Sequence, residues 1–379
     1  EDITVGMQQR TEILKMLYRE NDILIFDEPT AVLTPQEIDE LMEIMRNLAA
    51  EGKSILFITH KLNEIMAVAD RCSVLRKGKY IGTVQVKDTT KDELTTMMVG
   101  RPVQLTVEKK EIERQAPVLE VMDLSVASRY HKKDAVRHVS FDVHGGEIVC
   151  VAGIDGNGQS ELVYALTGLE KASGGRIVIG GQDVTHRNVR FRSEAGMSCI
   201  PEDRHKHGLV LDFPLEDNLI LHNYYQPRFD HKGFIDRAEE RKYAEVLIKR
   251  FDIRSGQGAA TIVRSMSGGN QQKAIIAREI DKDDALLIAV HPTRGLDIAA
   301  IEYIHRQIVQ QRDKGKGVLL VSYEMDEVIN LADRILVMYE GEIVGELNPK
   351  TTTPQELGLY MAGAKRNSDA ARKEESTDA

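Results

Sequence analysis

Short apolar runs alternate with longer stretches of mixed polarity along most of the chain. Four of these runs are almost wholly apolar: 23–26, 148–152, 285–290 and 317–322. Such runs between helical patterns are typical of strands in a parallel sheet that helices cover on both faces. The segments 118–126 and 136–143 instead alternate apolar and polar side chains, which also predicts strands. The pattern indicates an α/β fold.

One apolar run leads into a loop suited to phosphate. Residues 148–152 are followed by a glycine-rich loop at 153–158 and by a helical pattern over 160–166, which Gly168 closes. The N–H groups and the dipole at the start of a helix both favour anions. This strand–loop–helix unit therefore predicts a phosphate-binding site.

The rest of the chain is read more coarsely. Residues 201–264 are expected to be mainly helical. The segments 334–338 and 342–345, separated by Glu340-Gly341, predict a β-hairpin. Two more elements are predicted, a strand at 54–59 and a helix at 273–280.

The sequence contains an internal repeat at an offset of 263 residues. Gly6-Met7-Gln8-Gln9 matches Gly269-Asn270-Gln271-Gln272. Further matches at the same offset are Pro29-Thr30 with Pro292-Thr293, Ala69-Asp70-Arg71 with Ala332-Asp333-Arg334, Glu93-Leu94 with Glu356-Leu357, and Gly78, Gly82 and Gly100 with Gly341, Gly345 and Gly363. Chance does not hold one register over about a hundred residues, so we interpret the repeat as a duplicated domain.

The repeat predicts four regions. They are the first repeat at 1–100, a charged linker at 101–117, the second repeat at 118–363 and a polar tail at 364–379. We expect the tail to be disordered. Because 118 minus 263 is −145, the first repeat is expected to be the C-terminal part of a domain whose N-terminal half is missing. Its strand edges would then be uncovered.

Composition excludes several classes of protein. Lys plus Arg number 50 and Asp plus Glu number 60, which gives a net charge of −10. Because proteins that coat nucleic acid usually have a basic excess, no nucleic-acid partner is expected. No apolar run is long enough to span a bilayer. The three cysteines, Cys72, Cys150 and Cys199, have neither metal-binding nor disulfide spacing, which fits a reducing cytosol.

Two acids and a histidine follow predicted strands of the first repeat. Asp27 and Glu28 end the run 23–26, where an α/β sheet presents its ligand edge. The first acid can hold Mg²⁺, and the second can orient or deprotonate water. His60 follows the strand at 54–59, and we interpret it as a γ-phosphate contact.

A second glycine-rich segment precedes the predicted helix at 273–280. In Ser267-Gly268-Gly269-Asn270-Gln271-Gln272, the glycines allow backbone N–H groups to approach a phosphate closely. A plain helix cap accounts for Ser267 alone. It does not account for the recurrence of a glycine and two glutamines at the repeat position.

These motifs in this order resemble the ATPase subunit of an ATP-binding-cassette (ABC) transporter. Gly153-Ile154-Asp155-Gly156-Asn157-Gly158-Gln159-Ser160 fills the Walker A frame, and Ile25-Phe26-Asp27-Glu28 resembles Walker B. Met266–Gln272 and Ile3–Gln9 resemble the two signature motifs, and His60 the switch histidine. Within the family the chain is similar to tandem ATPases of bacterial importers for simple sugars and nucleosides. The resemblance implies a P-loop cassette with a mostly parallel sheet, an antiparallel β subdomain and a helical subdomain.

The second repeat departs from the family pattern where catalysis is expected. Gln159 replaces the Walker A lysine, and the Q-loop position holds Glu202. Val290 and His291 stand at the Walker B positions, and Tyr323 at the switch position. Loss of a general base alone typically costs about 10²–10⁴-fold in rate. We therefore expect the second pocket to bind nucleotide weakly, without hydrolysing it, and to supply its signature motif to the site of the first repeat.

The resemblance implies two unlike sites, because cassettes of this family pair head to tail around ATP and Mg²⁺. The first site would join the missing Walker A with the metal ligand Asp27 and the catalytic residues Glu28 and His60. From the second repeat it would take Ser267, Gly268, Gly269 and Gln271. The second site would use Tyr130, Gly153, Asp155, Gly156, Asn157, Gly158, Gln159, Ser160 (also a metal ligand) and Glu161, with Thr4, Val5, Gly6 and Gln8 from the first repeat.

The resemblance also implies a place for the protein in the cell. It predicts a peripheral subunit on the cytoplasmic face of the plasma membrane, held by permease subunits that a solute-binding lipoprotein serves. Glu202 and Phe213 are the candidates for contact with the permease. The solute is expected to be a nucleoside or a simple sugar, and Val290-His291-Pro292 favours the nucleoside branch. The alternatives are a soluble tandem ATPase, such as a translation factor or DNA-repair enzyme, and a nucleotide-sensing scaffold.

Overall fold

The structure is a computed structural model. It describes residues 5–19, 21–30, 33, 35–76, 78–103, 106–128 and 133–367, with the backbone alone at 5–10 and 35–36. Within these ranges, no helix is both long enough and apolar enough to cross a membrane.

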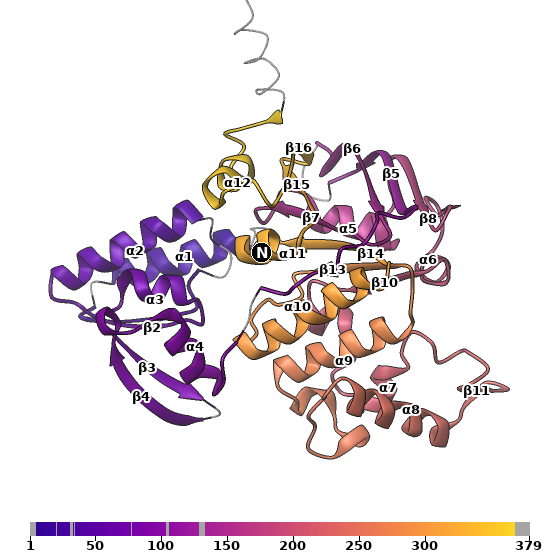
Figure 1. The fold of residues 1–379 in the computed structure, drawn as a ribbon, viewed down its shortest axis with the longest axis horizontal. Coiled ribbons are helices and arrows are strands. Elements are labelled where there is room, and N and C mark those ends of the chain that lie inside the picture. The colour runs from indigo at the N-terminus through magenta and orange to yellow at the C-terminus, as the bar shows by residue number, and fades with distance from the viewer. Residues whose placement is uncertain are drawn as a thin grey trace, which may run out of the picture.

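The second repeat is built on a six-stranded sheet (Figure 1). Its strands lie in the order β10 (Met197–Ile200), β13 (Leu286–Val290), β14 (Gly317–Ser322), β7 (Ile148–Gly153), β15 (Arg334–Tyr339) and β16 (Glu342–Leu347). Neighbouring strands run parallel except in the β15–β16 hairpin. The predicted parallel sheet and its terminal hairpin are confirmed.

A second, antiparallel sheet covers one face of the first. Its strands lie in the order β6 (Val136–His144), β5 (Pro117–Val126), β8 (Gly174–Ile179) and β9 (Gln182–Asp183). Together with α5 (Gln159–Thr167) it encloses a core in which Val149 and Val151 of β7 meet Val121, Val139 and Leu166. The two expected antiparallel strands are confirmed, and this core fixes the position of α5 beneath the glycine loop.

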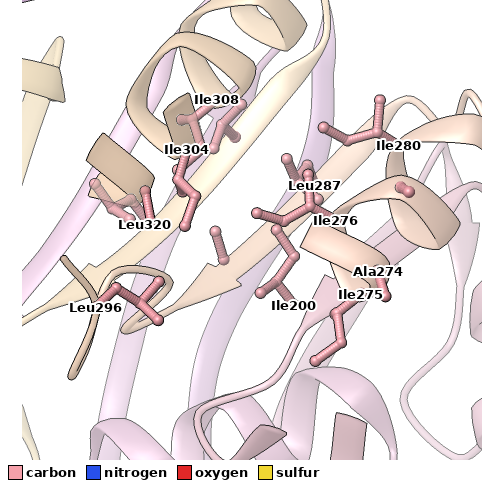
Figure 2. Packing of buried hydrophobic residues seen from close by; sticks show 14 of the residues in the cluster. Ile200, Ala274, Ile275, Ile276, Ile280, Leu287, Leu296, Ile304, Ile308 and Leu320 are labelled. Carbon is pink, nitrogen blue, oxygen red and sulfur yellow. The ribbon is translucent and has the colours of Figure 1, made fainter. Parts of the chain in front are cut away.

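Helices cover the opposite face of the central sheet. They include α9 (Gly268–Asp281), α10 (Ile298–Asp313), α11 (Met325–Leu331) and α12 (Pro354–Met361). Figure 2 shows Ile200, Leu287 and Leu320 of three adjacent strands facing Ile276 of α9 and Ile304 of α10. Because β7 is apolar at every position, alternate residues of the strand enter the cores on its two faces.

The expectation that residues 201–264 are mainly helical is wrong. The segment contains a π-helical turn at Arg204–Gly208, the short helix α7 (Leu215–Leu219) and only one long helix, α8 (Arg237–Arg250). The rest forms turns, two 3₁₀ turns and a small hairpin of β11 (Asp230–His231) and β12 (Phe234–Ile235). Pro201, Pro214 and Pro227 interrupt the helical pattern, because proline lacks the N–H that a helix interior requires.

The first repeat has the same order of elements as the C-terminal part of the second. They are α1 (Val5–Tyr18), β1 (Ile23–Asp27), α2 (Pro35–Ala50), β2 (Ser54–Ile58), α3 (Leu62–Val68), β3 (Arg71–Arg76), β4 (Lys79–Gln85) and α4 (Lys91–Val99). Shifted by 263 residues, α1, β1, α2, α3 and β3 coincide with α9, β13, α10, α11 and β15 at both ends. The elements of the two repeats thus correspond in order and nearly in length.

The strands of the first repeat form two separate pairs. β1 and β2 pair in parallel, and β3 and β4 form an antiparallel hairpin. In the second repeat β7 lies between β14 and β15, and the described part of the first repeat has no strand in that place. Ile23 and Ile25 are 69% and 59% exposed, whereas their counterparts Leu286 and Ile288 are fully buried in the core beneath α5 and the antiparallel sheet.

The segment between the repeats lies along the second one. Nζ of Lys109 donates to the Ala332 carbonyl oxygen at 2.7 Å and to Asp333 at 2.9 Å. The described start of the predicted tail is also held, because Lys365 and Arg366 pair with Glu356 and Glu342. Disorder of residues 368–379 stays a prediction, since they lie outside the described residues.

Candidate functional site

The glycine loop of the second repeat connects β7 to α5. Gly156 and Gly158 have φ of 89° and 99°, a region that favours glycine. A Cβ on Gly158 would lie 2.3 Å from the carbonyl oxygen of Ala135. The side chain of Asn157 accepts the Glu340 N–H at 2.9 Å and ties the loop to the β15–β16 turn. The chain therefore builds the loop that a phosphate requires.

Gln159 begins α5 at the position of the Walker A lysine. Its side chain is only 1% exposed, and neither atom of its carboxamide has a hydrogen-bond partner. The amide lies against Gly153, where a Cβ would come within 1.7 Å of Nε2. An unpaired buried polar group costs about 1–3 kcal/mol. The unpaired Nε2 donor suits a phosphate oxygen in the loop, whereas the Oε1 acceptor does not.

Ser160, the next residue, is linked to the Q-loop segment. Its Oγ donates to Oε2 of Glu202 at 2.8 Å, and Oε1 of Glu202 lies 3.5 Å from Nη1 of Arg294. Glu161, in the same first turn of α5, has its pKa raised by burial. The Glu202 carboxylate thus bridges the Ser160 hydroxyl and the Arg294 guanidinium.

The Walker B and switch positions of the second repeat form an aromatic contact. The rings of His291 and Tyr323 have centroids 3.9 Å apart, and the Tyr323 hydroxyl donates to Asp155 at 3.4 Å. Burial, reinforced by the charge of Arg294, lowers the pKa of His291 to about 3. A general base works best with a pKa near the working pH. His291 is thus a neutral group and a poor base at pH 7.

Val290 ends β13 at the position where the family holds its metal carboxylate. The side chain is buried in the core that also contains Leu162 and Val163 of α5. A cavity of about 30 Å³ lies beside it, bordered by Ser160 and Glu202. Ser160 keeps a hydroxyl suited to Mg²⁺, but Val290 offers no oxygen.

The corresponding positions of the first repeat hold a polar pair. Asp27 is exposed at the end of β1, and Nδ1 of His60 lies 2.9 Å from Oε1 of Glu28. Glu28 and His291 have φ of 45° and 44°, an uncommon backbone conformation for such residues. The Glu28 N–H donates to the Ile58 carbonyl, and that of His291 to Val321. The two repeats therefore share the backbone conformation at this position but carry side chains of different chemistry.

A buried carboxylate supports this backbone in each repeat. Glu64 accepts hydrogen bonds from the hydroxyls of Thr30 and Thr59, the latter at 2.9 Å. Its counterpart Glu327 accepts from Thr293 at 2.9 Å and also lies 3.0 Å from His305. Sequence reasoning missed both acids, although they share the 263-residue offset.

The signature segment of the second repeat starts α9. Ser267 occupies the N-cap position without a capping bond from its side chain, and its Oγ instead accepts from Asn270 at 2.9 Å. Gly268 and Gly269 form the first turn, which leaves the N–H groups of the helix start near these small residues. The amide of Gln271 is engaged with the Val263 carbonyl and with His205.

Arg204 joins the signature segment to the second pocket. Its Nη2 lies 3.1 Å from where a Cβ on Gly268 would stand, and Nη1 donates to the Arg294 carbonyl at 3.2 Å. Sequence reasoning missed Arg204 and Arg294, because nothing in the pattern marks an arginine that acts across 90 residues. Phe213, the other candidate contact for a permease, is 47% exposed.

Some predicted contacts cannot be located. Tyr130 and Thr4 lie outside the described residues. Val5, Gly6 and Gln8 form the start of α1, but only their backbone is described. In the view of Figure 1 this end of the helix is directed toward the second repeat. Their contact with nucleotide stays a prediction.

The two repeats touch through equivalent residues. Nζ of Lys61 lies 3.0 Å from Oε2 of Glu324, and 61 plus 263 is 324. The two partners of this ion pair thus occupy the same position in the two repeats. A second contact joins α4 to α10, beside each other in Figure 1, where Arg101 pairs with Glu302.

Comparisons with known proteins agree with this geometry. Residues 136–294 match the family model described as ABC transporter. The chain is 53% identical to the nucleoside import ATP-binding protein NupA of Lactococcus lactis, over 97% of this chain and 72% of that protein. It is also 53% identical to the guanosine import ATP-binding protein NupO of Bacillus subtilis, over 96% and 71% of the two chains. The ribose import ATP-binding protein RbsA of Clostridium tetani is 37% identical over 95% and 70%.

Solved structures support the fold. An ATP-binding cassette of an ABC transporter in its ADP conformation superposes with a TM-score of 0.53 at 19% identity, covering 65% of this chain and 96% of that one. A dimeric cassette in a post-hydrolysis state, bound to ADP and Pi, gives 0.52 at 20% identity, covering 62% and 100%. The predicted class, a P-loop cassette with a mostly parallel sheet, is confirmed.

Proposed function

Because this chain belongs to the ABC transporter family of ATP-binding import proteins, we propose that it binds and hydrolyses ATP to energise an importer. Identity of 53% to two nucleoside-type proteins, against 37% to a ribose protein, favours a nucleoside as the solute. The observation that carries the proposal is the contrast between Glu28–His60 and His291–Tyr323 on one shared backbone.

The catalytic site is the one that contains Glu28. Glu28 would orient or deprotonate the attacking water, and His60, at 2.9 Å, would hold that carboxylate and reach the γ-phosphate. Asp27 would hold Mg²⁺, which neutralises charge on the phosphates. Ser267, Gly268 and Gly269 of the second repeat would close over the same nucleotide. The Walker A sequence that such a site also uses is not found in residues 1–26.

The exposed face of β1 and β2 is suited to contact with a unit that carries a Walker A loop. In the second repeat, α5 and the antiparallel sheet cover the equivalent face, and the glycine loop leads from β7 into α5. Ile23 and Ile25 offer the apolar surface that such a strand–loop–helix unit would bury. We therefore propose that the first site is completed by a unit equivalent to residues 148–167.

The second site is proposed to hold nucleotide without hydrolysing it. The loop at 153–158 and the orphaned amide of Gln159 support phosphate binding. Val290 supplies no metal ligand, and His291 is a poor base because burial lowers its pKa to about 3. ATP held there would favour the closed arrangement of the two repeats, in the manner of a ligand that selects one of two states.

The proposal places the protein at a membrane through its partners. We propose that permease subunits dock on the region around Glu202 and Phe213, on the cytoplasmic face, while a solute-binding lipoprotein acts indirectly. Glu202 contacts Ser160 of the pocket, so movement at the docking surface would reach the nucleotide directly. The similarity to import ATP-binding proteins favours a coupled transporter subunit over a free-standing nucleotide sensor or soluble tandem ATPase.

Uptake by the assembled importer tests the proposed function. Vesicles containing the permease, the binding protein and the ATPase subunit are given labelled nucleosides or simple sugars, with ATP on the subunit side. We expect ATP-dependent accumulation of a nucleoside. Accumulation of a sugar alone would refute the nucleoside assignment, and ATP hydrolysis without any uptake would favour the uncoupled alternatives.

A further inference from the structure

The second pocket has lost the charges that normally hold a triphosphate. Gln159 is neutral, Val290 is apolar, and buried His291 is uncharged at pH 7 because its pKa lies at about 3. Charged hydrogen bonds to phosphate are roughly twice as strong as neutral ones. A pocket that holds nucleotide therefore gains from a cation supplied by another part of the chain.

Arg294 lies where such a cation is needed. Its N–H donates to the His291 carbonyl at 3.1 Å, so the residue is one turn beyond the Walker B position. The guanidinium is 3.5 Å from Glu202, whose other oxygen accepts from Ser160 at 2.8 Å. The charge of Arg294 also acts on His291 and Tyr323, lowering the pKa of the first and opposing the rise in the second.

The bond that occupies Arg294 is a weak one. Charge-assisted N–H···O bonds are usually about 2.7–2.9 Å long, shorter than the 3.5 Å between Arg294 and Glu202. The arginine side chain is 35% exposed, so the guanidinium is accessible from solvent. A phosphate entering the loop would meet Ser160 and could replace Glu202 as the partner of the arginine.

The repeat supplies an independent comparison. The position equivalent to Arg294 in the first repeat, 294 minus 263, is Ala31. The repeat that keeps Asp27 and Glu28 thus has no cation at this position, and the repeat that lost both acids has one. The difference fits a cation that compensates for the lost acid and lysine positions of the second pocket.

We propose that Arg294 is the phosphate-binding cation of the second pocket and makes it prefer nucleoside triphosphates to diphosphates. The arginine would exchange Glu202 for the terminal phosphate, while the amide of Gln159 and the hydroxyl of Ser160 contact the same phosphate chain. The inference rests on the proposed nucleotide binding by this pocket. To that proposal it adds Arg294 as the residue by which the second pocket distinguishes ATP from ADP.

Equilibrium binding of ATP and ADP to the full chain tests the inference. Isothermal titration is compared for the unchanged chain, Arg294→Ala and Arg294→Lys. Arg176→Ala is the matched control, because it removes the same charge from β8, where Arg176 is exposed and paired with Asp183. We expect Arg294→Ala to weaken ATP binding by about 10–100-fold, the effect of losing a charged hydrogen bond. ADP binding should change less than about threefold, and lysine should restore part of the loss.

The outcomes separate the two proposals. Equal loss of ATP and ADP affinity in Arg294→Ala, or a loss no larger than in Arg176→Ala, would overturn the role of Arg294. If the alanine variant fails to fold, Arg294→Lys provides the test, because it keeps the charge but changes the geometry of the donor. The proposal then predicts an ATP affinity below that of the unchanged chain and an ADP affinity close to it. If the unchanged chain binds neither nucleotide, the proposed function of the pocket fails, and this inference fails with it.

Discussion

Lys61 and Glu324 form an ion pair of 3.0 Å although 263 residues separate them, and they occupy the same position in the two repeats. Each follows a residue of a candidate site. His60 contacts Glu28, and the Tyr323 ring packs against the His291 ring. The pair therefore joins the two repeats beside both candidate sites.

Charge reversal at this pair should weaken the contact between the repeats. Lys61→Glu or Glu324→Lys alone is expected to lower the closed fraction about two- to fivefold, a modest effect because Glu324 is half exposed. The double variant, Lys61→Glu with Glu324→Lys, should recover it. Energy transfer between dyes on α2 and α12 reports closure. Failure of the double variant to recover would show that the pair does not hold the repeats together.

The two acid positions should differ in importance for hydrolysis. In the assembled importer, Glu28→Gln is expected to lower ATP turnover by about 10²–10⁴-fold, because the group that activates water is lost. His291→Ala should change turnover less than about threefold, since the buried ring has a pKa of about 3 and is a poor base. Steady-state phosphate release measures both. A comparable loss in His291→Ala would remove the asymmetry between the sites.

The unpaired amide of Gln159 should lower the free energy of unfolding of the chain without bound nucleotide. Gln159→Leu removes two unpaired buried polar atoms at similar volume, so the free energy of unfolding is expected to rise by about 1–3 kcal/mol. The same variant should bind ATP more weakly, because the donor in the loop is gone. Urea unfolding and titration with ATP measure the two effects. Lower stability together with unchanged binding would mean that the amide is structural.

Stability should depend on pH through His291. Its pKa falls from 6.5 to about 3 on folding, so between these values the unfolded chain binds more protons than the folded one. The free energy of unfolding therefore drops as pH falls below 6.5, by up to about 1.4 kcal/mol per pH unit. His291→Asn should reduce this slope between pH 6.5 and 5, measured by urea unfolding. His138→Asn, at an exposed histidine, is the control, and an equal slope in both variants would contradict the argument.

Much of the fold could be predicted because strong local signals agreed. The apolar runs and the glycine loop indicated β7, β13 and β14, and the 263-residue register indicated which elements correspond. The helical expectation for 201–264 failed because prolines and turns divide that segment. The chain there depends on packing against α9 rather than on periodicity.

The candidate site was less predictable than the fold. The positions of Gln159, His291 and Tyr323 followed from motif frames, but their contacts did not. Arg294 reaches Glu202, and Glu327 reaches Thr293, only after distant strands are brought together. When the role of a side chain depends on contacts with residues far away in the sequence, the local sequence pattern does not predict that role.

Nucleotide binding and turnover by the chain of residues 1–379 most directly test the central claim, that the second pocket holds ATP without hydrolysing it. Both are measured on one preparation, with contaminating ATPases excluded by a matched mock purification. The account predicts saturable ATP binding without turnover, because Val290 and His291 replace the acids and the first site lacks a Walker A. Turnover well above that of the mock preparation would contradict it, and Glu28 could no longer be the sole catalytic acid.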